Sequence, residues 1–463
     1  MSNNTSGSAK ATSIETNDVS PISAGERHGK AWHLFTVWSS PNLEFATVFI
    51  GALAIFAGLN VWQAILAVVL GNTLAAVTHG VLSTFGPSAG LPQMVLGRTA
   101  FGKIGNLLPA GLSTVIAGIG WFAVNSVSGA FALQSLIGEK NITAGLSLAI
   151  IVIVQIAVAF VGHNLIQKFE RYAFFYLVVV FAIVSFLFLT NGHYAVEATN
   201  GPFPWGPFSI AAATAYGYTA GWTPFASDYT RYLPANTNKR SLGLAAGLGN
   251  WFATSLLMTV GAVAFSSVVG EGNPTTAFTG ASVIPAWLGA LTLLGIAVGS
   301  VSANVLNVYS GAMSFLSLGI KLGFKARRAI MVAIAGVFGT FVAYQALDSK
   351  VKDSYEGFLL VVSYWVAPWI AIILVDHLLR KGQDKAELAL KAKRENLAGP
   401  IAFVVATVTS IALFGNQAFY HYVGFFLTEK TAGQFGDWTP LVGFVLAGVL
   451  YFVLAKLLKT DKK

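Results

Sequence analysis

Two tryptophans, each beside a glycine, lie in apolar stretches of the chain, and an asparagine lies near the first of them. Trp121 and Asn125, in Gly118-Ile-Gly-Trp-Phe-Ala-Val-Asn125, are four residues apart and so share one face of a helix. An indole face and a carboxamide one turn apart suit a flat heterocycle, since the ring stacks while the amide pairs with its polar edge. Trp222, which follows Gly221, is expected to supply a second aromatic face. The alternative is that both tryptophans are bulky anchors facing lipid, as most of the eleven must be.

A second polar run, from Gly299 to Ser310, has the sequence GSVSANVLNVYS. Asn304 and Asn307 are three residues apart, so both can meet one ligand or one neighbouring helix. Serine, asparagine and tyrosine commonly hold membrane helices together through hydrogen bonds. This run is more polar than that role alone requires, and we therefore expect Asn307 and Asn304 to contact a ligand.

Glu44 is the one acidic residue well inside the first five apolar segments. Ionisable groups within a membrane are costly and are functional candidates by default. We expect Glu44 to carry a proton or to neutralise a cation. The alternative is a carboxylate that is hydrogen-bonded to residues of the tail or of a loop.

The composition determines which elements must position these residues. Of 463 residues, 55% are hydrophobic and only 10% are charged, with a mean hydropathy of +0.67. Soluble domains carry about 25% charged residues, so the chain is predicted to be a polytopic membrane protein. Its long apolar runs lack the alternation of barrel strands, which favours helices. Without cysteine, it has neither disulfides nor thiolate metal sites. Twelve spans are expected, near residues 33–59, 61–84, 104–137, 142–162, 167–191, 207–231, 241–269, 283–318, 327–348, 355–378, 398–426 and 437–459.

The distribution of basic residues tests this number of spans. With the amino terminus inside, the tail (residues 1–30, expected to be disordered), the inner loops and the C-terminal end contain 24 of the 28 Lys and Arg residues. Cytoplasmic loops are enriched in Lys and Arg. We therefore predict that both termini are cytoplasmic. The net charge of +9 then belongs to the inner membrane face and not to a nucleic-acid interface.

Two spans carry polar interruptions that contain proline. The first includes Trp38-Ser-Ser-Pro-Asn-Leu-Glu44, and the sixth includes Tyr218-Thr-Ala-Gly-Trp-Thr-Pro-Phe-Ala-Ser-Asp228. Paired interruptions in the two halves of a chain point to a transporter's site at the membrane midplane, although proline and glycine are also simply common in membrane helices. An offset of five spans makes the two halves inverted.

The predicted fold is therefore all-α, with twelve transmembrane helices. It comprises a five-plus-five inverted repeat with broken helices one and six, followed by two additional C-terminal helices. The expected parts are the first repeat at residues 31–191, the second repeat at 207–378, a cytoplasmic loop at 379–397, and the last two helices with a short tail at 398–463.

Together, these motifs resemble the nucleobase–cation symporter family of cytosine/purine permeases, and their pattern is most similar to the purine–cytosine permeases. The similarity runs through about the first ten spans. No single motif is specific, but their order across spans one, three, six and eight is. The resemblance rests on Trp38-Ser-Ser-Pro-Asn42, Gly120-Trp121 with Asn125, Gly221-Trp222 through Ala226-Ser-Asp-Tyr-Thr-Arg-Tyr232, and Asn307-Val-Tyr-Ser310. The resemblance implies a substrate held between a helix bundle and a scaffold.

The resemblance also implies roles for individual residues at the substrate site. Trp121 and Trp222 would clamp the base, and Asn125 and Asn307 would contact its polar edge. Ser40 would add a hydroxyl from the broken first span. Gly221 and Asn304 complete the expected substrate-binding set.

In sodium-coupled members of that family, the ion lies between the first and eighth spans. The matching positions are Ser39 and Asn42 on one side and Gly299 and Ser302 on the other. Ala303 stands where those members have a second hydroxyl, so one oxygen ligand of a sodium site is missing. This favours protons over sodium, with Glu44 as the proton carrier.

These observations predict a secondary active transporter of the plasma membrane. It would import a nucleobase, cytosine or purines or both, with a coupled cation by alternating access. The alternatives keep the fold and change the cargo to another flat heterocycle, of the allantoin, hydantoin, thiamine or pyridoxine type, or to an amino acid or amine. The expected partners are the small-molecule substrate and the lipid bilayer, without nucleic acid. The oligomeric state stays open, with a monomer as one option. No cofactor is expected beyond the coupling ion, H+ or Na+. The sequence has no H-E-x-x-H, G-x-S-x-G or cysteine nucleophile, so an enzyme is not predicted.

Overall fold

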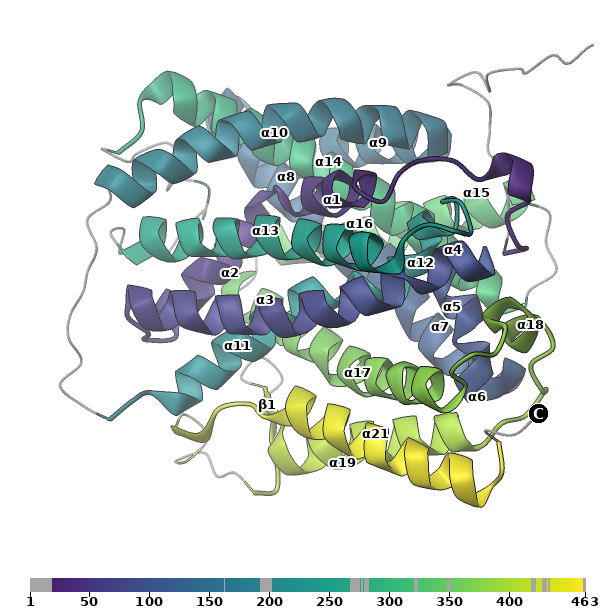
Figure 1. The fold of residues 1–463 in the computed structure, drawn as a ribbon. Helices are drawn as coiled ribbons and strands as arrows, with labels where there is room; N and C mark the ends of the chain where they lie inside the picture. Colours follow the sequence, from purple (N-terminus) through teal and green to yellow (C-terminus); the bar gives the residue numbers. More distant parts are fainter. Residues whose placement is uncertain are drawn as a thin grey trace, which may run out of the picture.

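The computed structural model describes residues 19–161, 163–191, 202–266, 275, 278, 283–319, 324–347, 351–417, 422–426, 431 and 434–460. Within these residues the chain is mostly helical (Figure 1). One short hairpin pairs β1 (Asn416–Gln417) with β2 (Tyr422–Val423) in antiparallel fashion.

The first half of the chain contains helices that are separated by short turns. They are η1 (Ala24–Glu26), α1 (His33–Ser39), η2 (Ser40–Asn42), α2 (Phe45–Phe56), α3 (Val61–Ser83), α4 (Phe85–Ala89), α5 (Gln93–Leu96), α6 (Arg98–Gly105), α7 (Leu107–Val115), η3 (Ile116–Trp121), α8 (Phe122–Ile137), α9 (Ala144–Val161) and α10 (His163–Asn191).

The second half repeats this pattern and adds a C-terminal pair. Its helices are α11 (Trp205–Ala220), η4 (Thr223–Phe225), α12 (Ala226–Thr230), α13 (Lys239–Ser266), α14 (Ala286–Ser317), α15 (Phe324–Ile334), η6 (Ala335–Gly339), α16 (Thr340–Leu347), α17 (Val351–Leu379), α18 (Lys385–Leu390), α19 (Ala398–Phe414) and α21 (Thr439–Leu457).

Eight helices among the described residues are long and apolar enough to cross a membrane, and the bent pair of α1 and α2 makes nine. The other three predicted spans correspond to shorter helices, namely α9, α11 with α12, and α19. The predicted eleventh span at 398–426 differs most from the structure. Its helix ends at Phe414, because Gly415 turns to an extended conformation (φ −60°, ψ 135°) and leads into β1.

The two halves pack on each other reciprocally, as an inverted repeat requires. α2, from the first span, packs on α13, and α11, from the sixth span, packs on α3. α8 and α14, from the third and eighth spans, pack on one another. Glycines allow the closest contacts: a Cβ built on Gly51 would lie 1.8 Å from the carbonyl oxygen of Met258, and one on Gly261 would lie 1.8 Å from that of Val48. Small residues at such crossings are typical of membrane helices.

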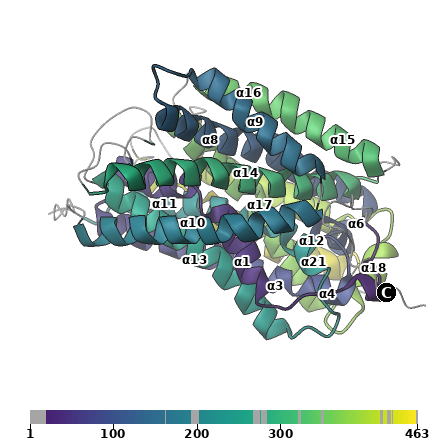
Figure 2. The ribbon, with the colours of Figure 1, turned by 90° about the horizontal axis from the view of Figure 1, so that it is seen from above.

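The C-terminal helices α19 and α21 pack on α17, along the edge of the molecule opposite α9 and α10 (Figure 1). In the second view, α9, α15 and α16 form an outer layer over α8 and α14 (Figure 2). The predicted pair of additional C-terminal helices is thus present as α19 and α21.

Residues 19–30 pack against the folded helices. Ile22 is 4% exposed, and its N–H donates to the carbonyl of Gly90 at 3.0 Å. The N–H of His28 donates to the carbonyl of Tyr232, and the guanidinium of Arg27 donates to the carbonyl of Pro87. Of the tail predicted to be disordered through residue 30, Ile22, Arg27 and His28 thus make hydrogen bonds to backbone carbonyls at or next to the ends of α4 and α12. Residues 1–18 of that tail lie outside the described residues.

Candidate functional site

The first span is interrupted where the sequence analysis placed the break. α1 ends at Ser39, and a 3-10 turn with Pro41 follows. Leu43 (φ −82°, ψ 65°) and Glu44 (φ −144°, ψ 170°) then leave the helical conformation before α2 begins at Phe45. The two halves meet at 61°. Backbone carbonyls that a continuous helix would use are therefore available for other partners.

The sixth span is interrupted at the corresponding place. α11 ends at Ala220, and Gly221 and Trp222 lead into a 3-10 turn at Thr223–Phe225. The indole N–H of Trp222 donates to Oδ1 of Asn42 at 2.9 Å, so a side chain from each break joins the two. The Asn42 amide also donates to the carbonyl of Trp38 at 2.7 Å and to Oδ1 of Asn250 at 3.1 Å.

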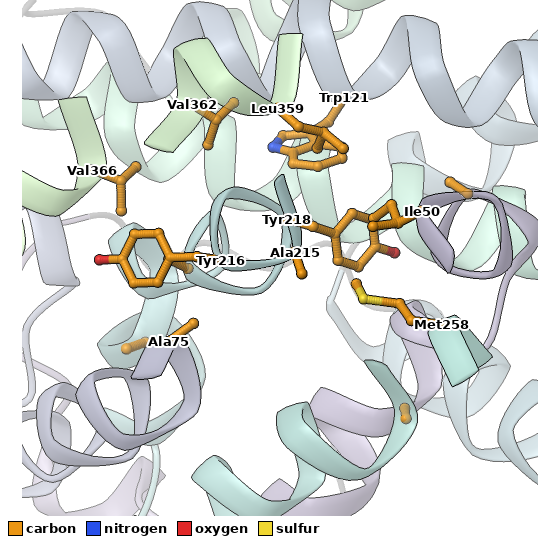
Figure 3. Close-up of a cluster of buried hydrophobic side chains, with 14 of the residues drawn as sticks. Ile50, Ala75, Trp121, Ala215, Tyr216, Tyr218, Met258, Leu359, Val362 and Val366 are labelled. Carbon is orange, nitrogen blue, oxygen red and sulfur yellow. The ribbon is translucent and has the colours of Figure 1, made fainter. Parts of the chain in front are cut away.

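Both predicted clamp tryptophans point into the protein. Trp121 is 6% exposed and Trp222 is 7% exposed, which excludes the alternative that they are anchors facing lipid. A Cβ built on Gly221 would lie 3.2 Å from Cζ2 of Trp121, so the first indole borders the break that carries the second. The ring of Trp121 also meets Tyr218 edge-on, with centroids 5.3 Å apart (Figure 3).

A π-helical turn sets the direction of Trp121. It spans Ile116–Trp121, and such turns often occur at functional sites. The glycines before the tryptophan leave room beside the helix, as their sequence suggested. Neighbouring side chains fill that room: a Cβ on Gly120 would lie 2.4 Å from the Phe358 ring, and one on Gly118 would lie 3.1 Å from Cε of Met331.

The three candidate asparagines form one network between α8 and α14. Oδ1 of Asn304 accepts from the amide N–H groups of Asn125 at 3.0 Å and of Asn307 at 3.4 Å. The amide of Asn304 donates to the carbonyl of Phe122 at 2.9 Å and to Oγ of Ser126 at 3.1 Å. All three asparagines are at most 1% exposed. Asn304 is thus the centre that orients the other two.

This network leaves two buried oxygens without a partner among the described residues. They are Oδ1 of Asn125 and Oδ1 of Asn307. A buried polar atom that lacks a partner costs free energy, so both oxygens are suited to accept hydrogen bonds from a bound molecule. The sequence had placed Asn304 in the substrate-contact set with them, whereas its own hydrogen bonds are made to protein groups.

Glu44 is buried at the first break, with 1% of its surface exposed. Oε1 accepts from the hydroxyl of Tyr218 at 2.9 Å, and that hydroxyl lies 2.6 Å from Oγ1 of Thr47. In the part of the chain that the structure describes, Oε2 has no hydrogen-bond partner. The alternative of a carboxylate bonded to tail or loop residues is wrong for Oε1, since its partner comes from the sixth span. No role was predicted for Tyr218 from the sequence. Its position three residues before Gly221, within the interruption of the sixth span, was the one signal that it could belong to the site.

The predicted cation positions partly come together. A Cβ built on Gly299 of α14 would lie 2.8 Å from the carbonyl oxygen of Leu43 and 3.1 Å from Cβ of Glu44, so this face of α14 touches the first break. Ser302 and Ala303 follow one turn later and are fully buried. Leu43, whose carbonyl lies nearest to Gly299, was not among the residues predicted from the sequence.

The other predicted residues of the first break are engaged elsewhere. The hydroxyl of Ser39 donates to the carbonyl of Gly249 on α13 at 2.9 Å. The carbonyl of Asn42 accepts from Oγ1 of Thr47 at 2.7 Å. Ser40 lies in the 3-10 turn and is 1% exposed. The break is therefore held on α13 by side chains from both of its ends.

Tyrosines border the candidate site on the side of α12. The hydroxyl of Tyr229 lies 3.0 Å from Oγ of Ser310, and that of Tyr232 lies 3.3 Å from the hydroxyl of Tyr309. The ring of Trp38 meets that of Tyr229 edge-on at 5.3 Å. These contacts tie the segment after the sixth break to α14.

Comparison with known proteins agrees with this arrangement. Among solved structures, the chain is similar to Mhp1, a nucleobase-cation-symport-1 family transporter in a closed conformation with bromovinylhydantoin bound. The TM-score is 0.75 at 19% identity, and 96% of each chain is covered. This likeness shows the fold.

Among curated proteins, the chain is 28% identical to YxlA of Bacillus subtilis (strain 168), provisionally named a purine-cytosine permease, over 96% of both chains. It is 26% identical to the purine-cytosine permease fcyB of Emericella nidulans, over 96% of this chain and 89% of that one. A family model described as permease for cytosine/purines, uracil, thiamine, allantoin matches residues 21–436. Members of this family are transporters and not enzymes. With its apolar helices and paired broken spans, the chain belongs to this family of multi-pass membrane permeases.

Proposed function

We propose that the protein imports a nucleobase in symport with protons. One observation carries the substrate assignment. Two buried indoles border the interruption at Gly221, and two buried amide oxygens, on Asn125 of α8 and Asn307 of α14, have no hydrogen-bond partner among the described residues. A flat ring between the indoles gains stacking energy, and its polar edge supplies the missing hydrogen bonds.

The orientation of the amides favours a substrate with N–H donors. Oδ1 of Asn304 holds the amide nitrogens of both Asn125 and Asn307, which leaves their oxygens free to accept. The exocyclic amines of cytosine and adenine are suitable donors. A pyrimidine with carbonyl groups at these positions would present acceptors to acceptors. We therefore expect cytosine and adenine to bind more tightly than uracil.

The proposed coupling ion is a proton carried by Glu44. Glu44 lies at the first break: its carboxylate accepts from Tyr218 of the sixth span, and its Cβ lies beside Gly299 on α14. Protonation removes a charge from this buried position and turns an acceptor into a donor. Sodium is disfavoured because Ala303 offers no hydroxyl beside Ser302.

Transport then follows from alternating access. A proton on Glu44 and a base between Trp121 and Trp222 are coupled only if each binds the outward-open and inward-open states differently. The hydrogen bond from Trp222 to Asn42 joins the two breaks, so a change at one can reach the other. The basic loops support a plasma-membrane orientation with both termini cytoplasmic.

Uptake by proteoliposomes tests this function. Purified protein is reconstituted, and radiolabelled cytosine, adenine and hypoxanthine are supplied under separately imposed proton and sodium gradients. We expect accumulation under an inward proton gradient and none under sodium alone. Accumulation that requires sodium would contradict the coupling, and absence of all nucleobase uptake with well-folded protein would contradict the cargo. A competition panel of allantoin, hydantoins, thiamine and pyridoxine then separates other flat heterocycles, and amino acids serve as the non-aromatic comparison.

A further inference from the structure

A groove runs along the outer surface between α3 and α13, away from the site described above. Its volume is about 500 Å³, and apolar side chains line most of it. Val77 is 62% exposed, Leu244 is 53% exposed and Leu248 is 50% exposed. In a membrane protein, an apolar surface of this kind faces the acyl chains of lipids.

Glycines at the helix crossing create the groove. A Cβ built on Gly80 of α3 would lie 2.5 Å from the carbonyl oxygen of Gly243, and one on Gly247 would lie 2.9 Å from that of Ala76. The two backbones therefore touch without intervening side chains. The space beside the crossing is bordered by larger residues on either helix, and it stays open toward the bilayer.

One end of the groove is strongly basic. Lys239 and Arg240, the first two residues of α13, both line it and both are exposed. Ion pairs within 4 Å in the described part of the chain join Arg380 to Asp376 and Lys391 to Glu387, so no carboxylate there pairs with either cation.

A further cation lies close to this end. Burial lowers the pKa of Lys385, in the loop helix α18, to about 8; the carboxylate of Asp376 opposes this shift, and the positive charge of Lys239 adds to it. Lys385 therefore lies within electrostatic range of Lys239 and brings a third cation to the mouth of the groove, while Asp376 is paired with Arg380. The basic-residue distribution places this mouth on the cytoplasmic face, where the leaflet contains anionic lipids.

We propose that this groove binds one anionic glycerophospholipid, with its phosphate against Lys239 and Arg240 and an acyl chain along Val77, Leu244 and Leu248. Basic pockets between membrane helices on this side are suited to anionic headgroups. The occupant needs both a negative headgroup and an apolar tail, since the site offers cations at one end and an apolar channel along the rest.

The bound lipid joins α3 to α13, the second spans of the two repeats. Both helices also hold the broken spans, because α13 packs on α1 and α2 while α3 packs on α11. The site is distinct from the proposed nucleobase site and does not depend on what the protein transports.

Native mass spectrometry of the detergent-purified full chain tests the proposal. The protein is titrated with phosphatidylglycerol or phosphatidylcholine of identical acyl chains, and glycerol 1-phosphate serves as a soluble competitor. We expect the wild type to prefer phosphatidylglycerol. Because each cation near an anionic headgroup changes affinity about 5-fold, Lys239→Gln with Arg240→Gln should weaken phosphatidylglycerol binding roughly 25- to 30-fold and leave phosphatidylcholine binding nearly unchanged.

Two control variants separate the headgroup from the groove. Lys393→Gln with Arg394→Gln removes the same charge from exposed positions that do not line the groove, and it should bind lipid like the wild type. Leu244→Trp narrows the acyl path and should weaken both lipids alike. Thermal unfolding confirms that each variant is folded, as expected for exposed positions.

Three results would overturn the proposal. The first is wild-type preference for phosphatidylglycerol in Lys239→Gln with Arg240→Gln, or an equal loss in the control pair. The second is unchanged phosphatidylglycerol binding in Leu244→Trp, which would mean that no acyl chain occupies the groove. The third is full displacement of the lipid by equimolar glycerol 1-phosphate, which would mean that the cations bind free phosphate.

Discussion

The two interrupted spans carry similar sequence motifs but are built differently. At the first break, Leu43 and Glu44 leave the helical conformation, and the span bends by 61°. At the sixth break, Gly221 (φ −56°, ψ −23°) and Trp222 (φ −80°, ψ −16°) stay near helical values, and the chain only tightens into a 3-10 turn. The first break therefore frees backbone carbonyls, whereas the second mainly redirects an indole.

The side chains at the two breaks also differ in their chemistry. The first break carries the buried carboxylate of Glu44 and the amide of Asn42, and it faces Gly299 on α14. The sixth break carries Trp222 and makes room for Trp121 at Gly221. One break thus has the chemistry to hold a proton or cation, and the other has the surface to stack a ring. The hydrogen bond from Trp222 to Asn42 links the two breaks.

The largest expected effect comes from removing the charge at the first break. Glu44→Gln keeps the acceptor for Tyr218 but cannot exchange a proton. A gradient of one pH unit can drive about tenfold accumulation when one proton is coupled, since both correspond to about 1.4 kcal/mol. We expect this accumulation to be lost while exchange of labelled for unlabelled cytosine persists in proteoliposomes.

Glu139→Gln, at an exposed loop position, is the matched control and should accumulate normally. If Glu44→Gln retains proton-driven accumulation, Glu44 does not carry the coupled proton, and the assignment of the ion to the first break is wrong.

The next largest effect concerns the sixth break. Trp222→Ala removes a stacking face, which is worth about 1–3 kcal/mol per base, or roughly 5- to 150-fold in apparent affinity. Trp222→Phe keeps a ring but loses the bond to Asn42, and we expect an intermediate loss. Trp62→Ala, at a 61% exposed position, is the control.

Trp121→Ala should behave like Trp222→Ala in the same uptake assay, since it removes the other face. Equal uptake by the wild type and Trp121→Ala, at equal expression, would show that the substrate does not lie between the two indoles.

A smaller effect is expected from the amide network between α8 and α14. Asn304→Ala deletes the acceptor that orients Asn125 and Asn307, so apparent affinity should fall about 5-fold, the equivalent of one hydrogen bond near 1 kcal/mol. Competition by unlabelled adenine measures this loss. Asn141→Ala, in an exposed loop, is the control. Unchanged affinity in Asn304→Ala would mean that the other two amides do not need it.

The smallest expected effect tests which cation is coupled to transport. Ala303→Ser restores a hydroxyl beside Ser302 on the face of α14 that approaches the first break. A single polar contact contributes about 0.5–1 kcal/mol, so sodium should stimulate uptake roughly two- to fivefold in this variant and not in the wild type. Stimulation of the wild type by sodium would show that Ala303 does not decide the ion.

Much of the architecture could be predicted from the sequence, because membrane insertion depends on local properties. Apolar runs located the spans, and proline beside polar residues located both breaks. The edges were less certain. The eleventh span ends at Phe414, where Gly415 turns to an extended conformation. The N–H of Asn416 then donates to Oδ2 of Asp437, a partner twenty-one residues later that no local signal announces.

For the candidate site, the sequence by itself determined which residue types were available: two tryptophans beside glycine, three asparagines on two spans and one acid well inside the first five spans. Only the tertiary structure decided which hydrogen-bond partners these residues have. It made Asn304 the centre of the amide network, paired Glu44 with Tyr218, and joined Asn42 to Trp222. The physical reason is distance along the chain. Hydropathy is local, but each of these hydrogen bonds connects helices more than 170 residues apart, and a polar group in a membrane takes whichever partner the packed helices bring to it.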